Sequence, residues 1–362
     1  MTTERHSRVI STEQAAQDFE KAVGVGVPTP LPENFIKKEM ILSTGSTLLD
    51  LAILGERVYG GGVPGGIIIE IFGEASTGKT ALAAEICGHA LSSGAEVVFN
   101  DPEATLDQEY CEIYGVSLTE TGNGRYERMK LVSEVFTDIF NWDPPNKDVV
   151  NVYATDSLAA LSTELEMEKG DKMGMRRAKE FSEGLRKACV KISDMNKLII
   201  CTNQTRQGDM GVVTPGGKGI PFYASVRLHI KPISYAKGLN FPSKLEREIK
   251  VGIKSKGITV IQGISQMVEV IKNKKDSPFR TAPIVIRFNY GVDDIYANLQ
   301  WLKDMTGDSS YSAVDKSYVQ LNSAIAYIEE NNLEKQLREQ VITLWMEIQD
   351  KAKISRKTKV RG

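Results

Sequence analysis

A glycine-rich segment near residue 75 has the residue types and spacing that bind a phosphate. It fits the pattern G-x-x-x-x-G-K-[ST] with Gly73, Glu74, Ala75, Ser76, Thr77, Gly78, Lys79 and Thr80. Backbone N–H groups in such a loop can surround an anion, and a lysine can reach the β- and γ-phosphates. The Thr80 hydroxyl can hold Mg²⁺. The segment therefore predicts a nucleoside triphosphate site.

The residues on either side of this loop decide between a phosphate site and a chance glycine loop. Residues 67–72 form an apolar run that predicts a buried strand, and residues 81–87 continue as a helix. A phosphate-binding loop joins a strand to the N-terminus of a helix, where the helix dipole favours an anion. The context favours the phosphate site.

Polar side chains end three other predicted strands. Asp156 can position Mg²⁺ through water, and Glu103 can polarise the water that attacks a γ-phosphate. Asn203-Gln204 ends a further strand, and a neutral amide there can hydrogen-bond that phosphate. The ends of parallel strands meet at one edge of a sheet. An N-cap role for Asp156 is an alternative that is compatible with metal binding. For Glu103 alone, a non-functional strand end is also open.

The order of the predicted elements indicates the fold class. Strands over 67–72, 95–100, 149–156 and 198–202 alternate with helices, including a long one over 176–196. This pattern predicts an α/β fold whose twisted, mostly parallel sheet has helices on both faces. Closely spaced strands follow over 224–230, 266–271 and 284–289, and predict an antiparallel extension. Helical segments, including 333–353, and a basic tail end the chain.

Composition excludes several classes of protein. The 362 residues are 41% apolar and 25% charged, with a net charge of −2, as in ordinary globular proteins. An apolar run of about 18 residues, which a membrane span needs, is missing, as is the apolar part of a secretory signal. The four cysteines are scattered, which predicts reduced thiols, no structural zinc and a cytoplasmic location.

The N-terminal segment predicts an isolated helix. Over residues 11–23, Ala15, Phe19 and Val23 would lie on one face. The Gly/Pro-rich residues 24–32 read as an extended linker. Such a helix cannot bury its apolar face by itself, so it is either mobile or docked, for example on a neighbouring subunit.

Two further segments have the composition of nucleic-acid contacts. Basic residues surround Met173-Gly174-Met175, where cations could neutralise phosphates and an apolar side chain could wedge between bases. A solvated basic face is the alternative. Residues 208–217 form a glycine-rich apolar loop whose amides could approach phosphates.

Together these motifs resemble the RecA family of DNA recombinases. The resemblance spans about residues 38–294 and includes residues 43–50, 61–80, 99–110, 156–161, 216–228 and 270–279 in the expected order. It implies a RecA-like P-loop ATPase core that binds ATP and Mg²⁺. It also implies helical filaments on single-stranded DNA, contact with double-stranded DNA, and no membrane partner.

The resemblance implies a role for each matched position. The catalytic set is Lys79, Glu103 as base, Gln204 as γ-phosphate sensor, and Lys272 and Lys274, which would reach a neighbour's triphosphate. Asp107, Tyr110 and Tyr290 would surround adenine, and Thr80 and Asp156 would hold Mg²⁺. The DNA-binding set is Lys172, Met173, Gly174, Arg176, Arg177, Arg186, Arg206, Met210, Gly211, Val212, Gly216, Gly217 and Lys218. Without the resemblance, the Lys272–Lys274 pair would read as a solvated turn.

The expected organisation is an N-terminal polymerisation helix and linker (1–36), an ATPase core (37–292) and a small C-terminal helical or α+β domain with a basic tail (293–362). The expected function is ATP-dependent homologous pairing and strand exchange. A RecA-like filament regulator and a ring helicase are the alternatives.

Three departures from the family pattern indicate a divergent member, and an origin on a virus or plasmid would account for them. The second loop is short, and Pro221 stands where the family usually has lysine. The tail is basic, with Lys351, Lys353, Arg356, Lys357, Lys359 and Arg361 and no acidic residue in the run to offset them. Such a tail should attract DNA.

Overall fold

The structure is a computed structural model that describes residues 40–116, 123–169, 174–193, 196–208, 211–215, 217, 219–250 and 257–356. The chain divides into two compact units, Met1–Lys37 and Lys38–Gly362. The helix expected over 11–23 belongs to the first unit and lies outside the described residues. Within the described part of the second unit, no helix is long and apolar enough to cross a membrane.

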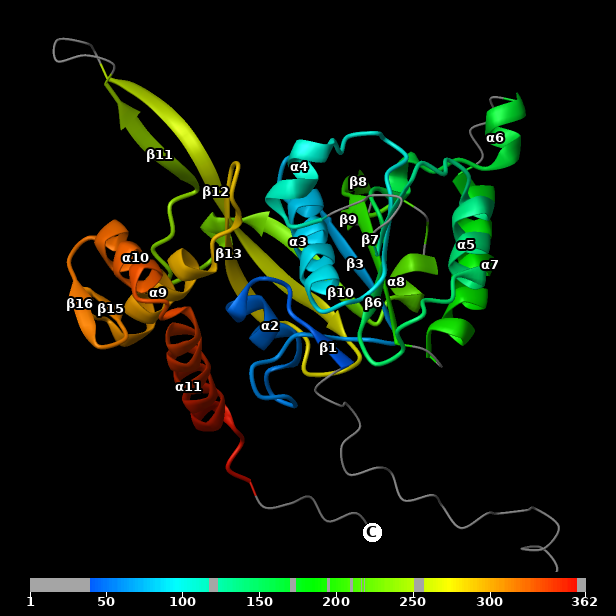
Figure 1. Cartoon of the computed structure of the whole chain (residues 1–362). Helices are drawn as coiled ribbons and strands as arrows, with labels where there is room; N and C mark the ends of the chain where they lie inside the picture. Colours follow the sequence, from blue (N-terminus) through cyan, green and yellow to red (C-terminus); the bar gives the residue numbers. More distant parts are fainter. Residues whose placement is uncertain are drawn as a thin grey trace, which may run out of the picture. The chain divides into compact units, whose positions relative to one another are not determined.

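A ten-stranded sheet forms the centre of the second unit (Figure 1), in the order β14-β13-β12-β10-β3-β7-β6-β4-β5, with β11 paired to β12. Its parallel part consists of β3 (Ile67–Gly73), β4 (Val97–Asn100), β5 (Gly124–Glu127), β6 (Asn151–Thr155), β7 (Lys197–Gln204) and β10 (Val226–Pro232). Its antiparallel part consists of β11 (Lys244–Ile249), β12 (Ile258–Asn273), β13 (Thr281–Arg287) and β14 (Gly291–Val292). The predicted α/β class and antiparallel extension are confirmed.

The direction of the connections explains why helices cover both faces of the sheet. Helix α3 (Lys79–Ser92) carries the chain from β3 outward to β4, past β7 and β6. Helix α7 (Gly174–Ser193) carries it back from β6 to β7. Because parallel crossovers are right-handed, opposite directions place these two helices on opposite faces. Each strand between them is therefore buried on both sides, as in β3, where all seven residues are buried.

An apolar cluster fixes α7 and α5 (Val132–Asn141) against one face of the sheet. Phe136 of α5 meets Phe181 of α7 edge to face, with ring centroids 6.0 Å apart. Gly184 of α7 makes room for the Phe136 ring, because a Cβ there would lie 2.3 Å from Cδ2. Leu185 and Ile192 continue the buried stripe of α7 toward the strands. The helix predicted over 176–196 is thus confirmed with slightly earlier bounds.

A buried carboxylate joins the first elements of the unit to its last helix. Strands β1 (Ile41–Leu42) and β2 (Val63–Pro64) flank α2 (Thr47–Leu54), which carries Asp50. Asp50 accepts hydrogen bonds from the hydroxyls of Ser43 and Thr44, each at 2.7 Å, and from Arg338 Nη2 at 3.1 Å. Arg338 lies in α11 (Glu334–Ala352). Because an unpaired buried charge is costly, this group of donors fixes α11 on α2.

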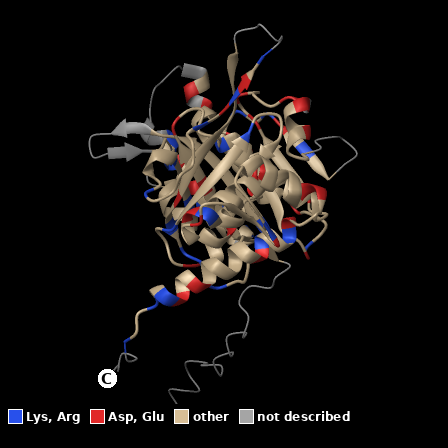
Figure 2. Cartoon of the chain, turned by 90° about the vertical axis from the view of Figure 1, so that its left-hand side faces the viewer, with Lys and Arg blue, Asp and Glu red and all other residues tan. Residues whose placement is uncertain are grey.

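The residues after 293 form α9 (Asp294–Thr306), the hairpin β15 (Tyr311–Ala313) and β16 (Lys316–Tyr318), α10 (Leu321–Glu330) and α11. Their assignment to a separate domain stays a prediction. Figure 2 shows charges of both signs along α11, the helix that leads to the C-terminus. Acidic residues just before the basic tail pair with its first two lysines. Lys351 pairs with Glu347 and Lys353 with Asp350, each at 2.6 Å, because helical spacing brings these side chains together.

Several elements differ from the predicted ones. Strand β12 has 16 residues, and its first half forms with β11 a two-stranded ribbon that extends beyond the rest of the sheet (Figure 1). The second glycine-rich loop contains a short hairpin, β8 (Arg206–Gly208) with β9 (Gly211–Val213). Backbone pairing, which apolar periodicity alone does not reveal, produces both features.

A glycine in α3 allows a close backbone approach that can be tested. A Cβ at Gly88 would lie 1.8 Å from the carbonyl oxygen of Tyr114. Helix propensity alone favours Gly88→Ala by about 1 kcal/mol. We expect instead that this substitution lowers the free energy of unfolding by about 3 kcal/mol, because the backbone must move. Urea unfolding of the two proteins measures the change.

The control is Gly94→Ala. Gly94 has φ +80, and a Cβ there would have no heavy atom within 4 Å, so only a local cost of about 1 kcal/mol is expected. A stability gain in Gly88→Ala, or a loss equal to that of the control, would contradict the packing argument.

Candidate active site

The phosphate loop is held in shape by two glycines that no larger residue could replace without displacement. A Cβ at Gly73, the last residue of β3, would lie 2.5 Å from the carbonyl oxygen of Ile230 in β10. Gly78 has φ +90, and a Cβ there would lie 2.3 Å from Cδ1 of Ile286 in β13. The loop between these glycines leads into α3. At Gly73 and Gly78 no side chain covers the backbone. This geometry suits binding of an anion at the helix N-terminus.

The lysine of the loop is largely buried. Lys79 is 9% exposed, and its Nζ donates to the carbonyl oxygen of Glu74 at 2.6 Å. The Thr77 hydroxyl donates to the same oxygen at 2.9 Å. Burial lowers the pKa of Lys79, while the carboxylates of Asp156 and Glu103 act in the opposite direction. A phosphate would supply a further negative charge beside this ammonium group.

Asp156 follows β6 and has an oxygen that the described residues leave without a hydrogen bond. Its Oδ1 accepts from the Thr202 hydroxyl, whereas the buried Oδ2 has no partner. Burial raises the pKa of Asp156, while the Thr202 hydroxyl and the nearby Thr80 hydroxyl act in the opposite direction. No group of three His, Cys, Asp or Glu side chains in the described ranges could hold a metal alone. Thr80 and Asp156 nevertheless fit Mg²⁺ that takes its other ligands from phosphates and water.

Glu103 lies after β4, next to β6 in the sheet, and its side chain is exposed. Ser157 donates its hydroxyl to Glu103 Oε1 at 2.6 Å. The structure thus brings together the predicted base and the residue that follows the predicted metal ligand. Sequence reasoning gave Ser157 no role, although a hydroxyl directly after Asp156 was a visible signal.

Gln204 ends β7 in register with Gly73 and is exposed, so its amide lies beside the start of the phosphate loop. The preceding residue, Asn203, is buried and donates to Glu70 Oε1 at 3.0 Å and to the carbonyl oxygen of Pro215 at 2.9 Å. Glu70 in turn binds Arg227 Nε at 2.6 Å. Sequence reasoning missed this buried network, which connects β3, β7 and β10 with the second loop.

A cavity of about 770 Å³ extends from the phosphate loop. One side consists of α4 (Gln108–Ile113) and the other of β12 and β13. Its lining includes Lys79, Thr80, Tyr110, Tyr114, Ile264, Gln266, Ile286, Phe288 and Asn289. Apolar and aromatic walls on both sides suit a flat ring such as a nucleobase.

The three residues predicted to surround adenine have different positions relative to this cavity. Tyr110 lines the cavity. Asp107 is the N-cap of α4 and accepts from the Tyr110 backbone N–H at 2.7 Å. Tyr290 is outside the lining of the cavity, which at that end consists of Phe288 and Asn289, although Phe288 and Tyr290 are each 53% exposed. Asn289, between these two aromatic residues, has φ 61 and makes a left-handed turn.

The two lysines predicted to act across a subunit boundary reach a common carbonyl group. Lys272 Nζ donates to the carbonyl oxygens of Pro221 at 2.6 Å and Phe222 at 2.9 Å. Lys274 Nζ lies 3.5 Å from the Phe222 oxygen. Both carbonyls belong to α8 (Gly219–Tyr223). Burial lowers the pKa of Lys272, and so do the charges of Lys274 and Arg227.

Only part of the predicted DNA-binding set can be placed. Arg177 is paired with Glu166 of α6 (Glu164–Lys169), with Nη2 and Oε1 2.9 Å apart, whereas Arg186 is exposed on α7. For five others only the backbone is described, in α7, β8 and β9: Gly174, Arg176, Arg206, Gly211 and Val212. Gly217 is exposed. Lys172, Met173, Met210, Gly216 and Lys218 lie outside the described residues.

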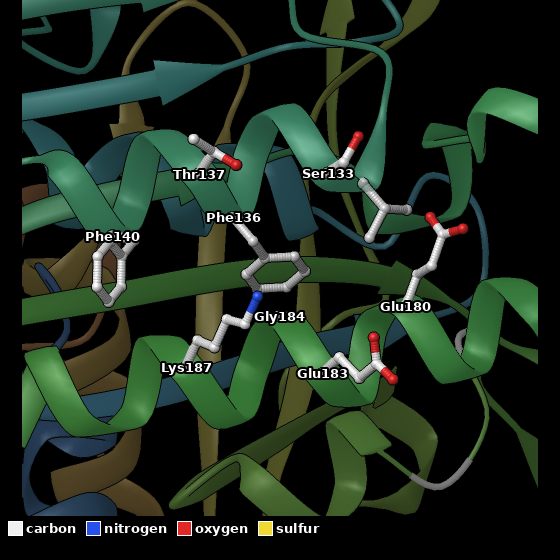
Figure 3. A pocket seen from close by; sticks show the side chains of 9 residues that line it. Ser133, Phe136, Thr137, Phe140, Glu180, Glu183, Gly184 and Lys187 are labelled. Carbon is white, nitrogen blue, oxygen red and sulfur yellow. The ribbon is translucent and has the colours of Figure 1, made fainter.

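A second hollow of about 500 Å³ lies between α5 and α7. Figure 3 shows Phe136 pointing from α5 toward α7, with Glu180, Glu183 and Lys187 on the α7 side. Phe140 of α5 is 42% exposed at one end. The hollow therefore combines an apolar floor with a charged rim, and no predicted site residue lines it.

Comparison with known proteins gives the family. A sequence model of the RecA N-terminal domain matches residues 10–293. Protein RecA of Thermus aquaticus is 35% identical over 300 residues, 79% of this chain and 78% of that protein. Protein RecA of Wolbachia sp. subsp. Brugia malayi is 32% identical over 361 residues, 92% of this chain and 91% of that protein.

Protein RecA of Delftia acidovorans is 32% identical over 301 residues, 81% of this chain and 74% of that protein. The domain match includes the phosphate loop, Glu103, Asp156, Gln204 and the lysine pair. The chain therefore belongs to the RecA family.

Proposed function

We propose that this protein is a DNA-dependent ATPase that forms helical filaments on single-stranded DNA and catalyses homologous pairing and strand exchange. The observation that carries the proposal is the meeting of Lys79, Asp156 and Glu103 at the carboxyl edge of the sheet, beside a cavity of about 770 Å³. A regulator without hydrolysis would have no need for this complete set. Because the chain belongs to the RecA family, we expect the ATPase to act in DNA recombination.

Each residue of the site has a proposed part in hydrolysis. The loop amides and Lys79 would bind the triphosphate, and Thr80 and Asp156 would hold Mg²⁺, which neutralises charge on the phosphates. Glu103 would accept the proton of the attacking water. Gln204 would hydrogen-bond the γ-phosphate from the end of β7. Tyr110 and Phe288 would cover the faces of the adenine ring.

The buried network next to Gln204 supports a coupling between nucleotide and DNA. Asn203 binds both Glu70 in the sheet and Pro215 in the second loop. A change at Gln204 would therefore reach the loop through a directly bonded neighbour. The partly buried ion pair of Glu70 with Arg227 resists independent movement of this group. We propose that the loop exposes its DNA-binding surface when ATP is bound.

Assembly would complete the active site. Lys272 is held against backbone carbonyls and close to two other cations, so a neighbour's triphosphate would be a better partner than a carbonyl dipole. The hollow between α5 and α7 would accept the apolar face of another copy's residues 11–23, which carries Ala15, Phe19 and Val23. The linker over 24–32 would span between the two copies.

The direct test of the function is a strand-exchange assay with the full chain, ATP and homologous DNA substrates. We expect DNA-stimulated hydrolysis and joint molecules that depend on ATP and on homology. ATP-dependent DNA binding without homologous pairing would contradict the recombinase and favour the filament regulator.

The shared site predicts the behaviour of a lysine variant. Lys272→Ala with Lys274→Ala should bind nucleotide as the wild type does, because Lys79 and the phosphate loop are intact. It should lose DNA-stimulated hydrolysis and stable filaments. Nucleotide titration and ATPase assays measure the two effects. Lys275→Ala is the matched control, because it removes the adjacent cation from the same turn.

Mixing the double variant with Lys79→Ala protein sharpens the test. Each protein supplies the group that the other lacks, so some interfaces in a mixed filament contain a complete site. Partial recovery of hydrolysis is expected. Full activity of the double variant alone, or no recovery in demonstrated mixed filaments, would exclude the shared site.

A further inference from the structure

The Ser157 hydroxyl binds a distant side chain instead of capping the turn that it begins. Ser157 is the N-cap of the short 3-10 turn Leu158–Ala160, yet its side chain makes no capping hydrogen bond. Instead it donates to Glu103 Oε1 at 2.6 Å. The two residues are 54 positions apart in the sequence. A capping role, the usual reason for serine at this position, therefore does not account for this hydroxyl.

The backbone that carries Glu103 is fixed separately. The Asp101 carboxylate is buried and accepts from the Leu106 backbone N–H at 2.9 Å and from the Tyr126 hydroxyl at 3.1 Å. Ala104 has φ 55, a left-handed conformation that a non-glycine residue adopts only when its surroundings impose it. Asp101 thus sets the path of the segment. The orientation of the Glu103 carboxylate is set by Ser157.

Ser157 itself is firmly placed. It is 3% exposed, and the residues that follow it, Leu158 and Leu161, belong to the buried core. Its bond occupies one oxygen of the exposed Glu103 carboxylate and leaves Oε2 for a further hydrogen bond. A general base must present an oxygen to the attacking water in a narrow range of orientations.

We propose that Ser157 is a positioning residue, which holds Glu103 by Oε1 so that Oε2 receives the proton of the water that attacks the γ-phosphate. The proposal rests on the function proposed above, and it adds a determinant of the rate that lies outside the phosphate loop. Ser157 does not touch the reacting atoms. Its contribution passes entirely through Glu103.

The first measurement is DNA-stimulated ATP hydrolysis by the full chain. Ser157→Ala should lower kcat by about ten- to a hundredfold, because a displaced base is a poor proton acceptor. The KM for ATP and the melting temperature should stay close to the wild-type values. Ser162→Ala, which removes a hydroxyl further along the same segment, should leave kcat unchanged.

The second measurement combines Ser157→Ala with Glu103→Gln. Glu103→Gln alone should reduce hydrolysis by roughly a hundredfold, the scale of losing a general base. Adding Ser157→Ala should then reduce it little further, because no base remains to be positioned. A purely structural role for Ser157 would make the two losses multiply.

The outcomes separate this proposal from the function on which it rests. Absence of DNA-stimulated hydrolysis in the wild-type protein would overturn the proposed function, and the role of Ser157 with it. An active wild type with an unchanged kcat in Ser157→Ala would overturn only the role of Ser157. Multiplying losses in the double variant would do the same.

Discussion

The structure depends on a buried ammonium group at the start of α3. Burial lowers the pKa of Lys79, and the carboxylates of Asp156 and Glu103 partly offset that effect. A cation in this position favours a phosphate, and the glycine backbone around it leaves room for one. The strand order serves the same site, because β6 and β4 run parallel to β3 and end at the same edge, where Asp156 and Glu103 follow them. The sheet thus positions the Lys79 ammonium group and the carboxylates of Asp156 and Glu103 at one edge.

The same sheet connects the nucleotide cavity with more distant surfaces. Strand β12 lines the cavity at Ile264 and Gln266 and ends beside Lys272, so one strand joins the site of its own chain to the surface proposed to meet a neighbour. Strand β7 ends at Gln204, next to the Asn203 network that reaches the second loop. Both connections pass through regular strands, which transmit displacement with little internal freedom. The surfaces proposed for nucleotide binding, assembly and DNA contact therefore share rigid elements.

The sequence predicted the parallel sheet and the strand, glycine loop and helix around residues 73–80 well, because buried strands leave apolar runs such as 67–72 and the loop needs glycines at fixed positions. It did not predict which residues meet across the sheet. Ser157 and Glu103 come together only because β6 lies beside β4. Phe288 lines the cavity and Tyr290 does not, with a left-handed turn at Asn289 between them, and Arg177 of α7 pairs with Glu166 of α6. Such contacts arise from strand order and turn geometry, and the periodicity of apolar residues predicts neither.

Electron microscopy of the full chain on long single-stranded DNA, in the presence of ATP and Mg²⁺, tests the central claim most directly. A site that is completed by a neighbour's lysines needs copies arranged head to tail, and an open arrangement of that kind gives a helix. We expect continuous helical filaments that require ATP and are absent with Lys79→Ala. Closed rings around the DNA would instead support a helicase, and isolated particles would contradict the shared active site.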